Sequence, residues 1–171
     1  MYPIASVTSP SGGTVAFNNI PQTFTHLQVR AFVRSAYGGS GGVNEDPFFR
    51  FNGNSYTFAG HSLQGNGSSA ISTGYTGISY GDMSVGMANN YLSSNIFGAY
   101  IFDILDYTNT NKYKTIRMIG GYDANGSGDV RLSSSLLQST DAITSISQFG
   151  GTATSGFVAG STIQLYGITT A

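Results

Sequence analysis

Short segments in which apolar and polar residues alternate, separated by clusters of Gly, Asn and Ser, recur along this chain of 171 residues. Residues that favour helices are scarce, because Glu45 is the single glutamate and Lys112 and Lys114 are the only lysines. No segment repeats apolar residues at the three- and four-residue spacing of an amphipathic helix. The alternation therefore predicts an all-β protein.

The longest alternating segment spans residues 26–37, where Leu27 and Val29 fall on one face of an extended chain and Gln28 and Arg30 on the other. Further strands are predicted over residues 4–7, 14–17, 48–51, 97–107, 112–122, 130–138, 142–149 and 161–168. Asn52-Gly53 predicts a hairpin turn, after which Tyr56 and Phe58 begin a return strand. The region 60–95 has few periodic features, although residues 75–83 could hold a strand.

These segments give about 8–10 strands at intervals of roughly 8–12 residues, a spacing typical of two packed antiparallel sheets. Length and uniform composition indicate one domain over residues 1–171. The fold prediction is a single-domain antiparallel two-sheet sandwich with jelly-roll-like topology, and no internal repeat is visible.

Charge is low, since charged residues make up 9% of the chain against roughly 25% in an average soluble domain. Seven Lys and Arg against eight Asp and Glu give a formal net charge of −1. Hydrophobic residues reach 40%, enough for one core. With scattered basic residues there is no electrostatic footprint for nucleic acid or an anionic membrane, so neither is expected as a partner.

The absence of cysteine excludes disulfides, thiol catalysis and Cys-based zinc sites. No run of about 18 apolar residues predicts a membrane-spanning helix. The start of the chain, MYPIAS, lacks a basic region followed by an apolar stretch, so no secretory signal peptide is expected.

The loop 123–129 is the segment that most resembles a metal site. Asp123, Asn125, Ser127 and Asp129 offer oxygen ligands at alternate positions, as in a calcium-binding loop. However, no acidic residue stands at the distal position and no helix flanks the loop. Asn125-Gly126 is also a hairpin signal, and a plain hairpin is the favoured interpretation over a weak metal site. No cofactor is expected.

Two histidines, His26 and His61, could serve hydrolytic or metal chemistry if they met acids such as Asp103 or Asp106. Neither lies in a catalytic motif, and no catalytic residue is nominated. Asp103 lies between Ile101 and Leu105 on one strand face. If that face is buried, Asp103 needs a partner, for which the candidates are Arg30, Arg34, Arg50 and Arg117. The alternative is that the face is solvent or interface, with Phe102 and Ile104 inward. A structural ion pair or an exposed acid is favoured over a catalytic role.

The 11 Tyr and 11 Phe residues could stack on sugars or could form the core and a subunit interface. For the tyrosines in or near the glycine-rich middle an interface is favoured; these are Tyr75, Tyr80, Tyr91 and Tyr100. The Gly-rich stretches, such as residues 38–42, lack the Gly-Lys-Ser/Thr ending of a phosphate loop.

Several segments spread over the whole chain resemble small virion proteins of tailed bacteriophages. They are IASVT (4–8), SGG (11–13), VAFNNIPQTFTHL (15–27), RFNG (50–53), GNGSS (65–69), TDAITSI (140–146) and FVAGSTIQLYGI (157–168). The resemblance implies a non-enzymatic structural protein, either a head decoration (cement) protein or a tail-associated protein, often a β-sandwich and often oligomeric. It supplies no catalytic residues.

The resemblance predicts a capsid decoration protein that forms a small symmetric oligomer such as a trimer and bridges capsid or other virion proteins. It would assemble in the host cytoplasm and remain in the virion. The alternative is a tail- or fibre-associated module that binds a glycan or receptor. An enzyme such as a depolymerase is disfavoured because the few acids show no paired spacing.

Overall fold

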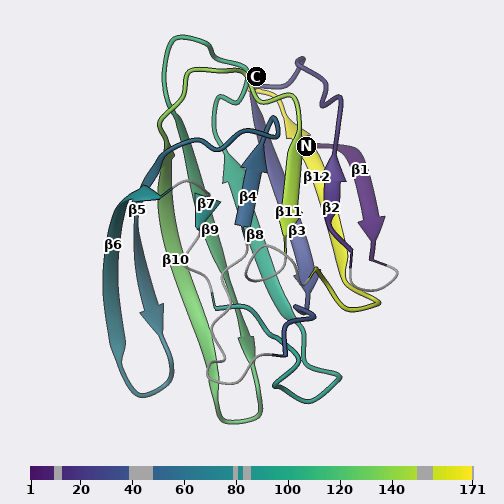
Figure 1. Ribbon diagram of the computed structural model, residues 1–171, viewed down its shortest axis with the longest axis vertical. Helices are drawn as coiled ribbons and strands as arrows, with labels where there is room; N and C mark the ends of the chain where they lie inside the picture. Colours follow the sequence, from purple (N-terminus) through teal and green to yellow (C-terminus); the bar gives the residue numbers. More distant parts are fainter. Residues whose placement is uncertain (10–12, 39–47, 79–80, 83–85, 150–155, 171) are drawn as a thin grey trace.

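Two antiparallel β-sheets make up the fold, and Figure 1 shows the smaller sheet lying across the middle of the larger one. The computed structural model describes residues 1–9, 13–38, 48–78, 81–82, 86–149 and 156–170. Within these ranges the secondary structure is strand and turn, without an α-helix. The predicted all-β two-sheet sandwich is confirmed.

The eight-stranded sheet runs from β1 at one edge to β6 at the other (Figure 1). In spatial order its strands are β1 (Tyr2–Thr8), β12 (Thr162–Ile168), β3 (His26–Val33), β8 (Gly98–Ile104), β9 (Lys114–Asp123), β10 (Gly128–Leu137), β5 (Phe58–Gly65) and β6 (Ala70–Ile78). The four-stranded sheet has the order β2 (Val15–Phe17), β11 (Ile146–Phe149), β4 (Phe48–Phe51) and β7 (Gly81–Asp82).

Eight of these strands have the connectivity of a jelly roll. Along the chain β1, β3, β8 and β12 belong to the large sheet, and β2, β4, β7 and β11 alternate with them in the small sheet. The orders β1-β12-β3-β8 and β2-β11-β4-β7 are the two four-stranded halves of that fold. The remaining strands, β9, β10, β5 and β6, extend the large sheet beyond β8.

The core lies between the sheets and follows the alternation of the strands. On β3 the predicted inward residues Leu27, Val29 and Val33 are buried. Phe49 of β4 packs edge-on against Phe102 of β8 with ring centroids 4.7 Å apart, so aromatic contact joins the two sheets.

Two positions in this core require glycine because an aromatic ring lies close to the backbone there, and neither glycine is in a turn. The ring of Tyr100 lies over Gly98 on its own strand and over Gly120 on β9, and a Cβ at either glycine would come within 2.7 Å of it. Tyr100 is buried, so its predicted place in an interface is wrong.

The predicted hairpin at Asn52-Gly53 is also wrong, although the turn itself exists. Asn52 and Gly53 have φ of 54° and 70°, but the following strand β5 joins the large sheet while β4 pairs with β7 and β11. The Asn52 side chain accepts the Thr144 N–H at 2.8 Å and donates to Ala142 O at 2.8 Å. These bonds hold residues 142–145 in a non-strand conformation, so β11 begins at Ile146 rather than at residue 142.

The glycine-rich middle contains more strand than expected, because β5 and β6 form a hairpin over Phe58–Gly65 and Ala70–Ile78. The loop predicted after Tyr37 and the end of the strand expected at 75–83 fall largely outside the described residues.

Candidate functional site

Four apolar side chains form a straight row on the outer face of the large sheet, the face turned away from the core. They are Ile101 of β8, Ile119 of β9, Leu132 of β10 and Leu63 of β5, and each stands directly opposite the next across the strands. Their exposed fractions run from 38% to 55%. We call this row the outer ridge.

The outer ridge is completed by β10 and β5, where the usual burial pattern is inverted over part of the strand. On β10 the polar residues Arg131, Ser133 and Ser135 are buried, whereas Val130 and Leu132 are exposed. In an antiparallel sheet with one solvated face the polar residues normally point outward. An apolar row facing outward, which begins on β8 at the margin of the jelly roll and continues across β9, β10 and β5, therefore marks a contact surface.

A row of small residues runs beside the outer ridge, one outward position further along each strand. It comprises Ala99, Gly121, Gly65 and Ala70, and is interrupted on β10 by Val130. We call it the trough. Three hollows of about 610, 380 and 290 Å³ open along it, and Ile119 lines all of them. The outer face is thus corrugated rather than flat.

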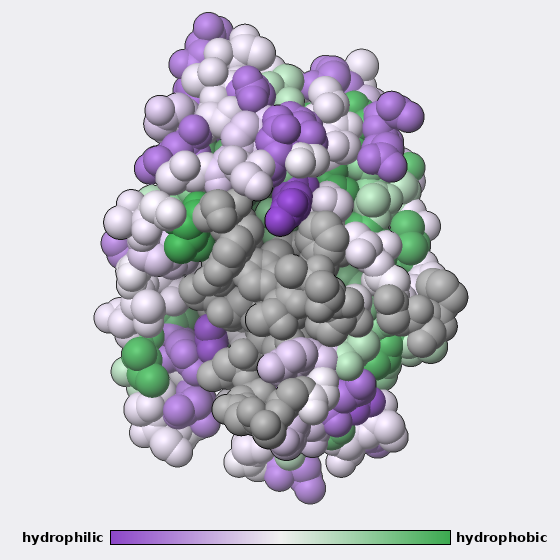
Figure 2. Space-filling view, in the orientation of Figure 1, coloured by the Kyte–Doolittle hydropathy of each residue, from purple (hydrophilic) through white to green (hydrophobic). Residues whose placement is uncertain are grey.

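The outer ridge differs from the side of the molecule seen in Figure 2, where the hydrophobic residues drawn in colour form small separate groups among hydrophilic and neutral ones. Isolated apolar side chains of that kind are ordinary on protein surfaces. The outer ridge differs from these groups because its four side chains are neighbours on consecutive strands and form one continuous row.

A polar row borders the ridge on its other side. Asp103 points outward from β8, accepts the Gln28 side-chain amide at 2.8 Å and lies 3.5 Å from Arg117 of β9. Its strand neighbours Phe102 and Ile104 are buried, so of the two alternatives the one in which Asp103's face points outward is confirmed, and Arg117 is its ion-pair partner. The row gives the apolar surface a charged border.

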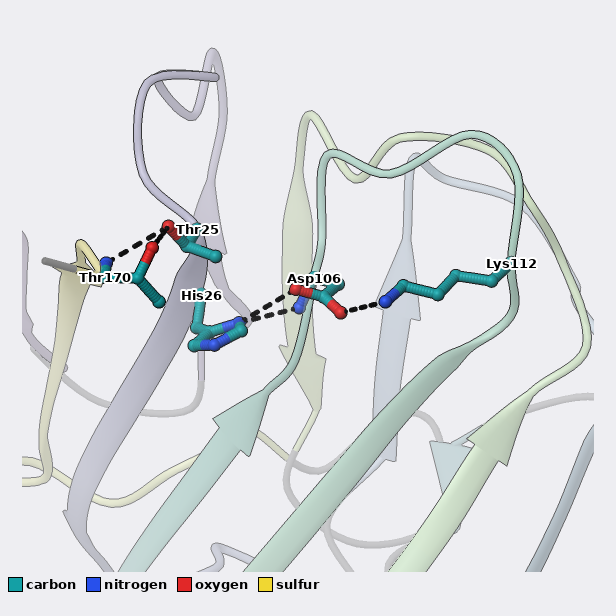
Figure 3. A network of polar contacts seen from close by, with 5 residues as sticks. All are labelled: Thr25, His26, Asp106, Lys112 and Thr170. Atoms are coloured by element: carbon teal, nitrogen blue, oxygen red, sulfur yellow. Dashed lines mark hydrogen bonds and ion pairs between the residues drawn. The ribbon is translucent and has the colours of Figure 1, made fainter.

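His26 and Asp106 meet at the start of β3, as Figure 3 shows, and Lys112 approaches from the far side of Asp106. His26 Nδ1 accepts the Asp106 backbone N–H at 2.9 Å and lies 3.4 Å from Asp106 Oδ1. The hydrogen bond and charge of Lys112 lower the pKa of Asp106. Beside His26, Thr25 and Thr170 form a separate pair, with their hydroxyl oxygens 3.2 Å apart (Figure 3).

The second histidine lies elsewhere. His61 is on the outer face of β5, against Gly74 of β6, and three strands separate β5 from β3 in the sheet. The structure therefore brings His26 to Asp106 but does not bring the two histidines together. The His26 network holds a turn, since Asp106 has φ of 50°.

The loop 123–129 is a tight turn between β9 and β10. Asn125 and Gly126 have φ of 59° and 101°, and Asp123 Oδ1 accepts the Asn125 N–H at 2.7 Å. Asp129 points to the buried side of the sheet while Asp123 is exposed, so the four residues proposed as metal ligands, Asp123, Asn125, Ser127 and Asp129, do not converge.

Asp129 instead forms a buried ion pair with Arg131. The Nε and a terminal nitrogen of Arg131 each lie 2.8 Å from Asp129 Oδ2, and the Gln64 amide donates to the same oxygen at 3.2 Å. Throughout the residues that the structure describes, no group of three or more His, Asp or Glu side chains is placed to hold a metal ion.

The other tyrosines expected at an interface have mixed positions. Tyr91 is exposed, Tyr75 is half-buried with its hydroxyl 3.0 Å from Ser135 Oγ, and Tyr80 lies outside the described residues. Sequence reasoning nominated these tyrosines for an interface and did not identify the outer ridge. A detectable signal existed, because Val130, Leu132 and Leu136 alternate with Arg131 and three serines.

Comparisons of the chain with protein-family models, with curated proteins and with solved structures found no match. In the described part of the chain, no helix is long and apolar enough to cross a membrane.

Proposed function

We propose that this chain is a non-enzymatic structural protein of a bacteriophage virion, a capsid decoration (cement) protein that stabilises the head by bridging neighbouring subunits. The observation that carries the assembly role is the outer ridge, an in-register apolar row exposed on the large sheet. The assignment to a virion rests on the sequence resemblance.

The low content of charged residues supports a protein whose surface is covered by partner subunits in an assembly. Soluble domains usually carry about 25–35% charged residues on their surface, which prevents association. This chain has 9% charged residues overall and a formal net charge of −1. Long-range repulsion between copies, or between this chain and a neutral shell, is therefore weak.

The apolar surface of the ridge supplies free energy for bridging. Burying a fully exposed Leu or Ile side chain contributes about 1.5–3 kcal/mol, so a half-exposed one contributes about 1 kcal/mol. Four ridge residues then contribute about 4 kcal/mol per copy before the cost of immobilisation. Repeated over many copies on a shell, such contacts stabilise the assembled state by mass action.

The test is the heat stability of the particle. Particles assembled with the chain should release their genome at a higher temperature than particles without it, and adding the purified chain should restore the difference. Ile119→Lys chains should restore less. Equal release temperatures would contradict the cement role, and a tail position with glycan binding would favour the receptor-binding alternative instead.

A further inference from the structure

We infer that the outer face of the large sheet binds a second copy of this chain, face to face and related by a two-fold axis. The inference rests on the proposed function only in treating this face as an assembly surface. It names the partner, and it can be tested on the isolated chain.

The outer ridge and the trough are complementary to each other. Large side chains occupy the ridge at Ile101, Ile119 and Leu63, and the residues one outward position along the same strands are Ala99, Gly121 and Gly65. Residues two apart on a strand lie about 7 Å apart. One surface therefore carries a row of projections and, beside it, a row of hollows that matches it on β8, β9 and β5 but is filled by Val130 on β10.

Consider a two-fold axis that lies between the ridge and the trough and runs parallel to both. It places the ridge of each copy against the trough of the other. On β9 such an axis passes over Gly120, so Ile119 of each copy faces Gly121 of the other. On β8 Ile101 faces Ala99, and on β5 Leu63 faces Gly65 by the same operation. On β10 the operation sets Leu132 opposite Val130, so two apolar side chains meet there instead of a projection and a hollow. Every contact then occurs twice, which is the defining property of an isologous interface.

Charge complementarity follows from the same axis. Arg117 and Asp123 lie on the outer face of β9, each three residues from Gly120 and on opposite sides of it. The two-fold operation therefore sets Arg117 of one copy opposite Asp123 of the other, twice. Arg117 is 59% exposed at the side chain, so it can reach a partner while its 3.5 Å contact with Asp103 persists. A two-fold axis running along β9 instead of across it would set Arg117 opposite Arg117 and Asp123 opposite Asp123.

The area is adequate for a stable pair. With strands about 4.8 Å apart and about 3.4 Å per residue, the eight strands of the sheet and seven residues along each present roughly 900 Å². A standard protein interface covers about 800 Å² per partner. The ridge crosses four of the eight strands, β8, β9, β10 and β5, and forms the apolar part of this area, while the row of Asp103 and Arg117 forms part of a polar rim.

Sedimentation equilibrium of the purified chain tests the inference. The wild-type chain should be a dimer at micromolar concentration, and Ile119→Lys should raise the dissociation constant at least tenfold. The matched control is Ile71→Lys, because Ile71 is also an exposed isoleucine, at 45%, but points to the opposite face of the sheet. It should leave the constant within twofold.

A monomeric wild-type chain, a trimer, or equal weakening by both lysine variants would overturn the inference. Circular dichroism and the unfolding midpoint show whether each variant is folded. A dimer whose loss leaves the heat stability of particles unchanged would contradict the proposed function while leaving the interface intact.

Cysteine pairing gives a second, independent test, because the chain has no cysteine of its own. Ala99→Cys and Ile101→Cys are each made separately, mixed and treated with a short bifunctional thiol-reactive crosslinker, because sheets packed face to face lie about 10 Å apart, too far for a direct disulfide. The axis sets position 99 of one copy over position 101 of the other, so the mixture should give several-fold more crosslinked dimer than either variant alone. Equal yields in all three samples would contradict the two-fold arrangement.

Discussion

His26 Nδ1 accepts the backbone N–H of Asp106 at 2.9 Å across 80 residues of sequence. This bond holds the left-handed Asp106 turn between β8 and β9 against the start of β3. His26→Ala should leave that N–H unpaired and lower the free energy of unfolding by about 1–3 kcal/mol.

His61→Ala is the control, since His61 is exposed on the outer face of β5. Surface substitutions of that kind change stability by about 0.5 kcal/mol or less. Urea unfolding midpoints of both variants compare the two sites, and equal losses would show that the His26 bond has no special role.

Two Arg–Asp pairs in one sheet allow burial to be tested directly. Arg131 and Asp129 are both buried, whereas Arg117 beside Asp103 is largely exposed. Arg131→Met leaves a buried carboxylate without its counter-charge and should cost about 3–5 kcal/mol. Arg117→Met should cost at most about 1 kcal/mol. A similar cost for both, measured by denaturant unfolding on monomeric protein, would contradict the burial of Asp129.

Stability at high pH should depend on Tyr100. Burial raises the pKa of Tyr100 above its usual value of 10.0, so the unfolded chain loses this proton first. The folded state is therefore favoured below pH 10 and loses that advantage as pH rises above it. Tyr100→Phe should flatten the decline above pH 10 while costing about 1 kcal/mol at neutral pH through lost hydrogen bonds.

The relevant bond is the one from the Tyr100 hydroxyl to Gly86 O, 3.0 Å long. Exposed Tyr113 provides the comparison, and Tyr113→Phe should leave the alkaline limb of the stability curve as it is in the wild type. An unchanged alkaline limb in Tyr100→Phe would show that other groups dominate.

Calcium should not stabilise the chain. The carboxylates of Asp123 and Asp129 point to opposite sides of the sheet, and Asp129 already pairs with Arg131. In a thermal scan, calcium at about 10 mM should therefore shift the unfolding temperature no more than magnesium at the same concentration does, because a ligand stabilises a protein only by binding to its folded state. A calcium-specific rise of several degrees would establish a metal site in the loop 123–129.

The strands that sequence reasoning located best are those with apolar residues on the core side. The alternation of Leu27, Val29 and Val33 predicts both β3 and the face that it buries. In β9 the pattern likewise places Ile116 and Met118 opposite Arg117 and Ile119.

The extension strands were harder to interpret for a physical reason. Their inward positions carry Gly60, Ser62 and Ser133, and their outward positions carry Leu63 and Leu132. A rule that buries apolar residues gives the wrong face there. The outer ridge is formed by residues that stand opposite one another on neighbouring strands. Which residues are opposite depends on the strand register, and the sequence of a single segment does not contain that information. Asn52 shows the same limit, because its side chain binds residues about 90 positions away.

The most direct test of the account is an image of the assembled particle at side-chain resolution. We expect this chain to lie on the head of the particle. Ile119 and its ridge neighbours should be covered by a second copy, and Arg117 should face Asp123 of that copy. A particle that lacks the chain, or one in which the outer face of β8, β9, β10 and β5 is open to solvent, would contradict it.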